Sequence, residues 1–162
     1  MRFPMPDIKT NVMRILDKKK VAYEAHTYPH GDTAVDGATV AELTGQAPEQ
    51  VFKTLITQGA SKQYYVFVIP VLTELDLKKA AKAAGEKSVA MLHVADLLPL
   101  TGYVRGGCSP IGMKKLFPTF IDSAAQNVPT IMVSAGKIGY QVELAPADLL
   151  PLCRGKYAEV TK

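Results

Sequence analysis

Two neighbouring segments of strongly β-forming residues constrain the fold more than any other part of the sequence. Segments 51–58 and 64–70 have the sequences Val-Phe-Lys-Thr-Leu-Ile-Thr-Gln and Tyr-Tyr-Val-Phe-Val-Ile-Pro, and a short turn that begins at Gly59 separates them. This pattern predicts two antiparallel strands joined as a hairpin. The second strand is apolar on both faces, which predicts a central position in its sheet.

Helices and further short strands surround this hairpin without forming regular βαβ units. Asp7 is placed to cap the first helix, while Gly45 and Gly85 are placed to end the second and third. The predicted helices and helical turns cover 8–20, 39–44, 76–84, 94–98 and 146–151. The other predicted strands cover 21–28, 89–91, 119–122, 130–134 and 140–144. Together these elements predict an α+β fold around a curved, mixed and mostly antiparallel sheet.

Length and composition predict one globular domain spanning residues 1–162. Apolar residues make up 48% of the chain and charged residues 21%, a balance typical of a folded protein with an ordinary core. No apolar run is long enough to cross a bilayer, and the first residues lack a signal-peptide core, so we expect a cytoplasmic protein without a membrane partner. Cys108 and Cys153 are too few for a disulfide framework, and we expect free thiols.

The segment 102–118 combines four glycines with three basic side chains, a hydroxyl, a thiol and two prolines. Glycine permits positive φ and lets a ligand approach bare backbone amides, and successive amides can form a concave nest for an anion or a carbonyl oxygen. Arg105, Lys114 and Lys115 add positive charge. The segment is therefore a candidate binding loop, although a surface loop rich in turn residues has the same composition.

Lys53 lies in the first strand of the hairpin, where both faces are partly apolar. It shares a face with Val51 and Leu55, while Phe52 and Ile56 take the other face. An ammonium group placed there loses water and needs a carboxylate or an anionic ligand nearby. Two interpretations remain open, namely a functional cation and a lysine that is paired structurally or reaches solvent at an edge.

No protein nucleophile is evident from the sequence. Cys108 would need a base, and the three histidines lie far from it in sequence, so a buried and inert thiol is the preferred interpretation. Ser109 precedes a proline, and its hydroxyl and amide are better placed to shape the turn or contact a ligand than to attack one.

Two further groups of polar residues have less specific patterns. His26 and His30 alternate with Tyr28 at a strand end, but no third ligand at diagnostic spacing supports a zinc site, and we expect no metal. Asp122 stands at a strand end beyond the glycine-rich segment. It is placed either to pair with Lys53 or orient a substrate amine, or to cap the turn that follows it.

The charge of the chain is mildly basic. Net charge is +4 and the isoelectric point is near 9.0, with lysines clustered at 18–20, 78–82 and 114–115. Such clusters suit a polyanion such as RNA, although lysines on helices more often form a solvated face, which we favour for the first two clusters. The sequence lacks zinc-finger, RRM and helix-turn-helix motifs, so DNA binding is not expected.

Five segments occur in the order seen in the YbaK-type Cys-tRNA(Pro) deacylases, and the chain resembles this family from about residue 8 to 157. They cover 26–30 (His-Thr-Tyr-Pro-His), 51–55 (Val-Phe-Lys-Thr-Leu), 75–79 (Leu-Asp-Leu-Lys-Lys), 102–115 (Gly-Tyr-Val-Arg-Gly-Gly-Cys-Ser-Pro-Ile-Gly-Met-Lys-Lys) and 133–137 (Val-Ser-Ala-Gly-Lys). Members are free-standing relatives of the editing domain of bacterial prolyl-tRNA synthetases. The resemblance implies a mixed sheet partly closed into a barrel and flanked by helices. It also implies hydrolysis of the ester that joins a wrong amino acid to the tRNA 3′ end.

The resemblance also assigns roles to individual residues. Catalytic roles are implied for Lys53, Gly106, Gly107 and Ser109. A substrate-binding role is implied for Tyr28, and we also predict substrate contacts from His26, Thr54, Cys108, Asp122 and Ser134. In the implied mechanism the cysteine thiol of the substrate attacks its own carbonyl and releases the tRNA together with a cyclic thiolactone, so neither a cofactor nor a protein nucleophile is required. The protein contributes positioning and charge stabilisation.

Two positions depart from the family pattern. Gln141 stands where the best-known members have an aspartate, so an electrostatic role is lost or passes to Glu143, and Cys108 replaces an aliphatic residue. The first departure leaves amino-acid specificity open. The leading hypothesis is therefore a Cys-tRNA(Pro) deacylase that acts on the tRNA 3′ end, with prolyl-tRNA synthetase as a possible partner. The alternatives are a deacylase for another small amino acid such as alanine, or a non-catalytic module that binds tRNA ends or nucleotides.

Overall fold

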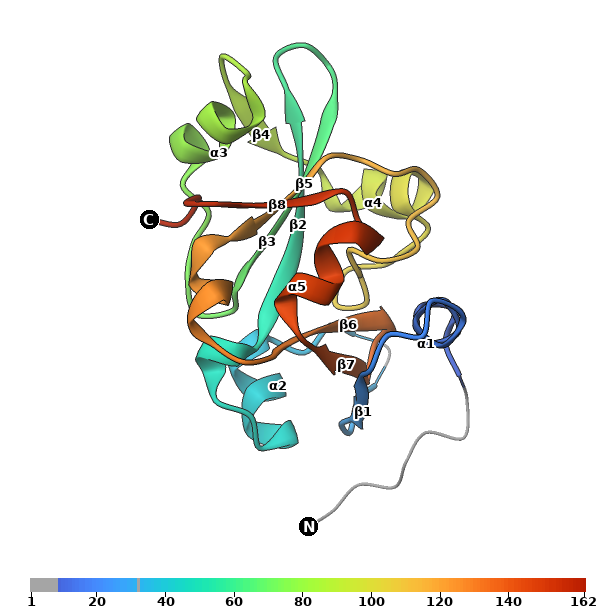
Figure 1. Cartoon of the computed structure of the whole chain (residues 1–162). Coiled ribbons are helices and arrows are strands. Elements are labelled where there is room, and N and C mark those ends of the chain that lie inside the picture. Colours follow the sequence, from blue (N-terminus) through green and yellow to red (C-terminus); the bar gives the residue numbers. More distant parts are fainter. Residues whose placement is uncertain (1–8, 32) are drawn as a thin grey trace.

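A computed structural model describes residues 9–31 and 33–162 of the chain (Figure 1). The α-helices are α1 (Asn11–Lys18), α2 (Gly37–Thr44), α3 (Leu77–Ala84), α4 (Val94–Thr101) and α5 (Pro146–Leu149). The strands are β1 (Glu24–Thr27), β2 (Phe52–Gly59), β3 (Tyr64–Pro70), β4 (Val89–Met91), β5 (Thr119–Asp122), β6 (Ile131–Lys137), β7 (Tyr140–Leu144) and β8 (Gly155–Ala158). Short 3-10 helices cover η1 (Pro48–Gln50), η2 (Ser123–Asn127) and η3 (Leu150–Leu152).

The larger sheet has five strands in the order β4-β2-β3-β5-β8. The predicted hairpin forms its centre: β2 and β3 are antiparallel, and Lys53 lies opposite Ile69. Strands β5 and β8 extend the sheet in parallel pairs beyond β3. The residues of β3 from Tyr65 to Pro70 are all buried, which confirms the prediction that this strand is central.

The smaller sheet contains β1, β7 and β6, and both of its strand pairs are antiparallel. An isolated parallel bridge between Val51 and Met132 joins the start of β2 to β6. We call this meeting of the two sheets the sheet junction. The predicted α+β class with a mixed, mostly antiparallel arrangement of strands is confirmed. Closure into a partial barrel stays a prediction.

Three groups of buried side chains hold these layers together. Helix α1 packs Val12, Met13 and Leu16 against the smaller sheet and part of the larger one. Helix α3 packs Ala80 and Ala81 against the opposite side of β3. A third group surrounds the sheet junction and comprises Tyr28, Val40, Ala41, Val51 and Met132. Several polar side chains lie next to this third group.

Several predicted boundaries are corrected by the structure. Helix α1 begins at Asn11, and its cap is Thr10, whose hydroxyl accepts a hydrogen bond from the Met13 amide; Asp7 and Ile8 lie outside the described residues. Helix α4 continues through Pro99 to Thr101, although a proline inside a helix removes one backbone hydrogen bond, and it ends three residues later at Gly102 in a left-handed conformation. Gly45 and Gly85 end α2 and α3 in left-handed conformations, as predicted.

The C-terminal strand β8 was not predicted. Its sequence, Gly-Lys-Tyr-Ala, has no long β-forming run, and it forms because β5 offers a parallel edge for pairing. In the part of the chain that the structure describes, each helix is too short or too polar to traverse a bilayer.

Candidate functional site

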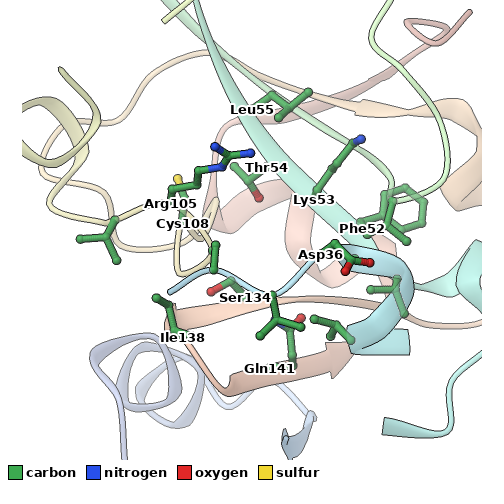
Figure 2. A pocket seen from close by; sticks show the side chains of 18 of the residues that line it. Asp36, Phe52, Lys53, Thr54, Leu55, Arg105, Cys108, Ser134, Ile138 and Gln141 are labelled. Carbon is green, nitrogen blue, oxygen red and sulfur yellow. The ribbon is translucent and has the colours of Figure 1, made fainter. Parts of the chain in front are cut away.

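A cavity of about 1000 Å³ opens beside the sheet junction (Figure 2). One wall is β2, which contributes Lys53, Thr54 and Leu55, and the facing wall is the β6–β7 hairpin. The remaining lining comes from the start of α2 and from the glycine-rich segment. The polar and glycine residues of the lining are Tyr28, Thr33, Asp36, Gly37, Lys53, Thr54, Arg105, Gly106, Cys108, Ser134 and Gln141. A space of this size suits a nucleotide or a comparable small molecule.

Lys53 is a half-buried cation without an ion-pair partner among the described residues. Burial lowers the pKa of Lys53 below its ordinary value of 10.5, because water no longer fully solvates the ammonium group. Glu74 opposes this shift from a distance, but its carboxylate binds Lys162 Nζ at 3.1 Å. The interpretation of Lys53 as a structurally paired lysine is therefore not supported, and its charge is available to a ligand.

Arg105 places a second positive charge in the cavity lining, from the glycine-rich segment. Figure 2 shows Arg105 and Lys53 on either side of Thr54. The lining also contains the carboxylate of Asp36, which caps α2 by accepting hydrogen bonds from the Thr39 amide at 3.0 Å and the Thr39 hydroxyl at 2.8 Å. These hydrogen bonds lower the pKa of Asp36, so it stays ionised. Two cations against one committed carboxylate make this a site for an anionic ligand.

The glycine-rich segment approaches its neighbours too closely for a side chain. Gly106 has φ +85°, and a Cβ atom there would lie 2.7 Å from Ala34 Cβ. At Gly107 a Cβ atom would lie 3.1 Å from the Ile138 amide nitrogen. Gly106 lines the cavity, whereas the Gly107 amide already donates a hydrogen bond to the Val104 carbonyl. The Gly107 amide is therefore not free to join a nest of amides around a ligand.

The two other predicted residues of this segment differ in placement. Cys108 lines the cavity, but burial raises the pKa of its thiol to about 12, so the nucleophilic thiolate is absent at neutral pH. Ser109 is fully buried outside the lining, and its hydroxyl accepts a hydrogen bond from the Ile111 amide at 3.2 Å. Ser109 thus shapes the turn, one of the two roles that its sequence context indicates.

The opposite wall brings Ser134, Ile138 and Gln141 to the cavity, and Tyr28 lies beside them. Ser134 and Gln141 are paired in register on β6 and β7, so their side chains share one face of the smaller sheet. The Ser134 hydroxyl accepts a hydrogen bond from the Gly136 amide at 3.1 Å. This wall carries hydroxyls and an amide but no charge.

His26 and Asp122, which were predicted to bind substrate, do not line the cavity. Asp122 is buried at the end of β5, where its carboxylate accepts from the Ala124 amide and the Val160 amide, both at 3.1 Å. It caps η2 and holds the chain after β8, and it does not pair with Lys53. His26 Nε2 lies 2.8 Å from Glu143 Oε1, next to but outside the lining. Both residues are committed to structural partners.

His26 belongs to a group that could hold a metal ion. Glu24, His26 and Glu143 each place one ligand atom within 4.8 Å of the others. The Glu143 carboxylate is already shared with the hydroxyl of Thr130, at 2.5 Å, and the amide of Gln46, at 3.4 Å. Because these partners occupy the Glu143 carboxylate, Glu143 does not supply to the cavity the negative charge that is missing at Gln141.

Sequence reasoning missed the contributions of segment 33–37 and of Ile138. These residues lie in turns that only tertiary packing brings to the cavity. Asp36 gave a usable signal, because an acidic residue ahead of a helix is a common cap, but that signal says nothing about a cavity.

Comparisons with known proteins show similarity to aminoacyl-tRNA editing proteins. Residues 29–152 match the family model described as "Aminoacyl-tRNA editing domain". The chain is 50% identical over 153 residues to the Enterococcus faecalis (strain ATCC 700802 / V583) protein "Putative Cys-tRNA(Pro)/Cys-tRNA(Cys) deacylase EbsC", covering 94% of this chain and 93% of that one.

Solved structures share the fold. A crystal structure described as that of a putative trans-editing enzyme for prolyl tRNA synthetase matches with a TM-score of 0.79 at 21% identity, covering 93% of this chain and 96% of the other. A crystal structure of a hypothetical protein matches with a TM-score of 0.84 at 20% identity, covering 93% and 99%.

Proposed function

Because this chain belongs to the aminoacyl-tRNA editing domain family, we propose that it is a deacylase that removes cysteine from mischarged tRNA(Pro). The family expected from the sequence is thereby confirmed. Prolyl-tRNA synthetase cannot exclude cysteine well by size alone, since a difference of one small group changes binding only modestly. A separate editing site that hydrolyses the mischarged tRNA overcomes this limit. The reaction belongs in the cytoplasm, where charged tRNA is used.

The observation that carries this proposal is that Lys53, which has no ion-pair partner within 9–31 and 33–162, lines the same cavity as Arg105, and that this cavity is large enough for a nucleotide. A tRNA 3′ end presents phosphate and ribose oxygens together with an ester carbonyl. Lys53 and Arg105 hold the terminal phosphate or a ribose oxygen, Gly106 leaves room for the ester, and Tyr28 closes the pocket. Charge complementarity and close backbone approach thus orient the ester.

The chemistry of the substrate supplies the nucleophile. The lining contains no histidine, and the Cys108 thiol is protonated because its pKa is about 12. We therefore assign attack to the sulfur of the bound cysteinyl group. The C–S bond forms as the ester C–O bond breaks, the thiol proton passes to the ribose oxygen, and water later opens the thiolactone to free cysteine. Lys53 and Arg105 stabilise negative charge that develops on the oxygens.

A deacylation panel tests this proposal. Cys-, Ser-, Ala- and Pro-charged tRNA(Pro) are incubated with catalytic amounts of protein, with and without prolyl-tRNA synthetase. We expect multiple turnovers on Cys-tRNA(Pro) and much slower release of serine, because a hydroxyl is the poorer internal nucleophile. Preferential release of alanine would instead show that the substrate carries another small amino acid in place of cysteine. Protection of the ester at stoichiometric protein would instead identify a non-catalytic binder of tRNA ends, and faster turnover with synthetase would support a partnership.

A further inference from the structure

Two buried side-chain atoms lack a hydrogen-bond partner in the described part of the chain, and both belong to residues that line the cavity. They are Thr54 Oγ1 and Gln141 Oε1. Buried polar groups in folded proteins are nearly always paired, because an unpaired one keeps its full desolvation penalty. Two such atoms in one cavity indicate that its occupant provides the missing partners.

Gln141 cannot find its partner among its neighbours on the smaller sheet. Its side chain is 6% exposed, and the residues opposite it in register are His26 and Ser134. His26 Nε2 is engaged with Glu143, and the Ser134 hydroxyl, which accepts from the Gly136 amide, donates no hydrogen bond to Gln141 Oε1 in the described part of the chain. The Gln141 carbonyl oxygen is therefore left to accept a hydrogen bond from whatever fills the cavity.

The two walls of the cavity differ in charge. Lys53 and Arg105 lie along β2 and the glycine-rich segment, whereas the wall that carries Gln141 is uncharged. Figure 2 shows the side chains of Thr54 and Gln141 entering the cavity from these opposite walls. A matching ligand has oxygens with negative charge at one end and a hydrogen-bond donor at the other. An aminoacyl nucleotide has this form, since its α-ammonium group is a strong donor.

We propose that Gln141 Oε1 accepts a hydrogen bond from the α-ammonium group of the bound aminoacyl ester, while the Thr54 hydroxyl, on the cationic wall, donates to one of the oxygens of the ligand. This inference depends on the proposed function and adds a preference to it, namely for a free amine. A buried acceptor pairs more strongly with a charged ammonium donor than with the neutral N–H that an acylated amine keeps. N-blocked esters, including formyl-aminoacyl and peptidyl esters of tRNA, are thus disfavoured as substrates.

A non-hydrolysable ligand measures this interaction separately from catalysis. Adenosine carrying cysteine through a 3′-amide, and its N-acetyl derivative, are titrated by calorimetry into the full-length wild type and Gln141→Met. We expect the wild type to bind the free amine roughly 10-fold or more tightly than the N-acetyl form, from the net value of a charge-assisted hydrogen bond. Gln141→Met should lose this preference and keep its affinity for the N-acetyl form. Gln46→Met, which alters a glutamine outside the cavity lining, is the matched control and should behave as wild type.

Turnover separates a failure of this inference from a failure of the proposed function. If the wild type deacylates Cys-tRNA(Pro) and N-acetyl-Cys-tRNA(Pro) at equal rates, amine recognition is refuted while the deacylase remains. If the wild type deacylates neither substrate, the proposed function itself fails. Thr54→Val, nearly identical in shape to threonine, removes the hydroxyl of the cationic wall. It should weaken binding of both ligands alike and leave the amine preference unchanged. An unchanged amine preference in Gln141→Met with an unchanged melting temperature would overturn the inference.

Discussion

Replacing Gly106 with alanine tests the close approach that forms the mouth of the cavity. Two costs add at this position. The backbone has φ +85°, a left-handed conformation that costs an L-residue roughly 1–2 kcal/mol. The new methyl group would also lie 2.7 Å from Ala34 Cβ and 2.9 Å from Ala34 Cα, so the chain before α2 must move, at a further cost of roughly 1–3 kcal/mol.

Gly45 offers a matched control, because it has φ +71° with no atom within 4 Å of an added Cβ. Gly45→Ala should therefore show the backbone cost alone. A change of 1 kcal/mol moves the melting temperature of a chain of this length by about 2–4 °C. We expect a loss of about 2–8 °C for Gly45→Ala and about 4–20 °C for Gly106→Ala, measured by differential scanning calorimetry. The double variant Ala34→Gly/Gly106→Ala should recover part of the difference, since it removes the nearest atom.

Deacylation by Gly106→Ala, measured at a temperature where the variant is folded, should fall together with affinity for the adenosine ligand. Equal destabilisation by Gly45→Ala and Gly106→Ala would refute the packing of segment 33–37 on the glycine-rich segment. Retention of full activity in Gly106→Ala would remove this glycine from the site.

Three further substitutions separate charge, reactivity and structural support. Lys53→Met should lower kcat/KM for Cys-tRNA(Pro) by roughly 100-fold or more, the usual effect of removing a group that stabilises developing charge. Burial lowers the pKa of Lys53 in the folded protein, so the unfolded chain binds the proton more tightly. The stability of the wild type therefore rises with pH between the lowered pKa and 10.5. Lys53→Met should flatten this rise when melting temperatures are measured as a function of pH. Cys108→Ala should keep activity within about tenfold, since loss of a true nucleophile costs far more, and iodoacetamide should leave the native thiol unmodified at pH 8. Asp122→Ala should lose about 2–4 kcal/mol of stability through its two buried hydrogen bonds while kcat of the folded protein is unchanged, and selective loss of kcat would restore a substrate role for Asp122.

Local patterns in the sequence predicted the elements that local forces stabilise. The hairpin of β2 and β3 follows from two β-forming runs, and Gly45 and Gly85 end their helices in the left-handed conformation that glycine permits. Lys53 was recognised as a candidate because a cation between apolar neighbours loses water whatever the remaining fold. These predictions needed no information about distant residues.

Features that depend on tertiary contacts could not be obtained in this way. Strand β8 exists because β5 presents an open edge, and nothing within its four residues requires a strand. Asp122 was predicted to contact substrate, but its carboxylate is held by two amides that follow it in the chain, one of them 38 residues away. The resemblance to known proteins indicated which residues gather in the cavity, and the packing decided which of them reach it.

The two sheets that meet at the sheet junction contribute walls of different charge to the cavity. Strand β2 carries the positive charge, while β6 and β7, almost 80 residues later in the chain, carry the uncharged face. A change on the later strands can alter which small molecule is accepted without disturbing the strand that we propose holds the nucleotide. Substrate preference can thus change among related proteins while the positive charge on β2 is retained.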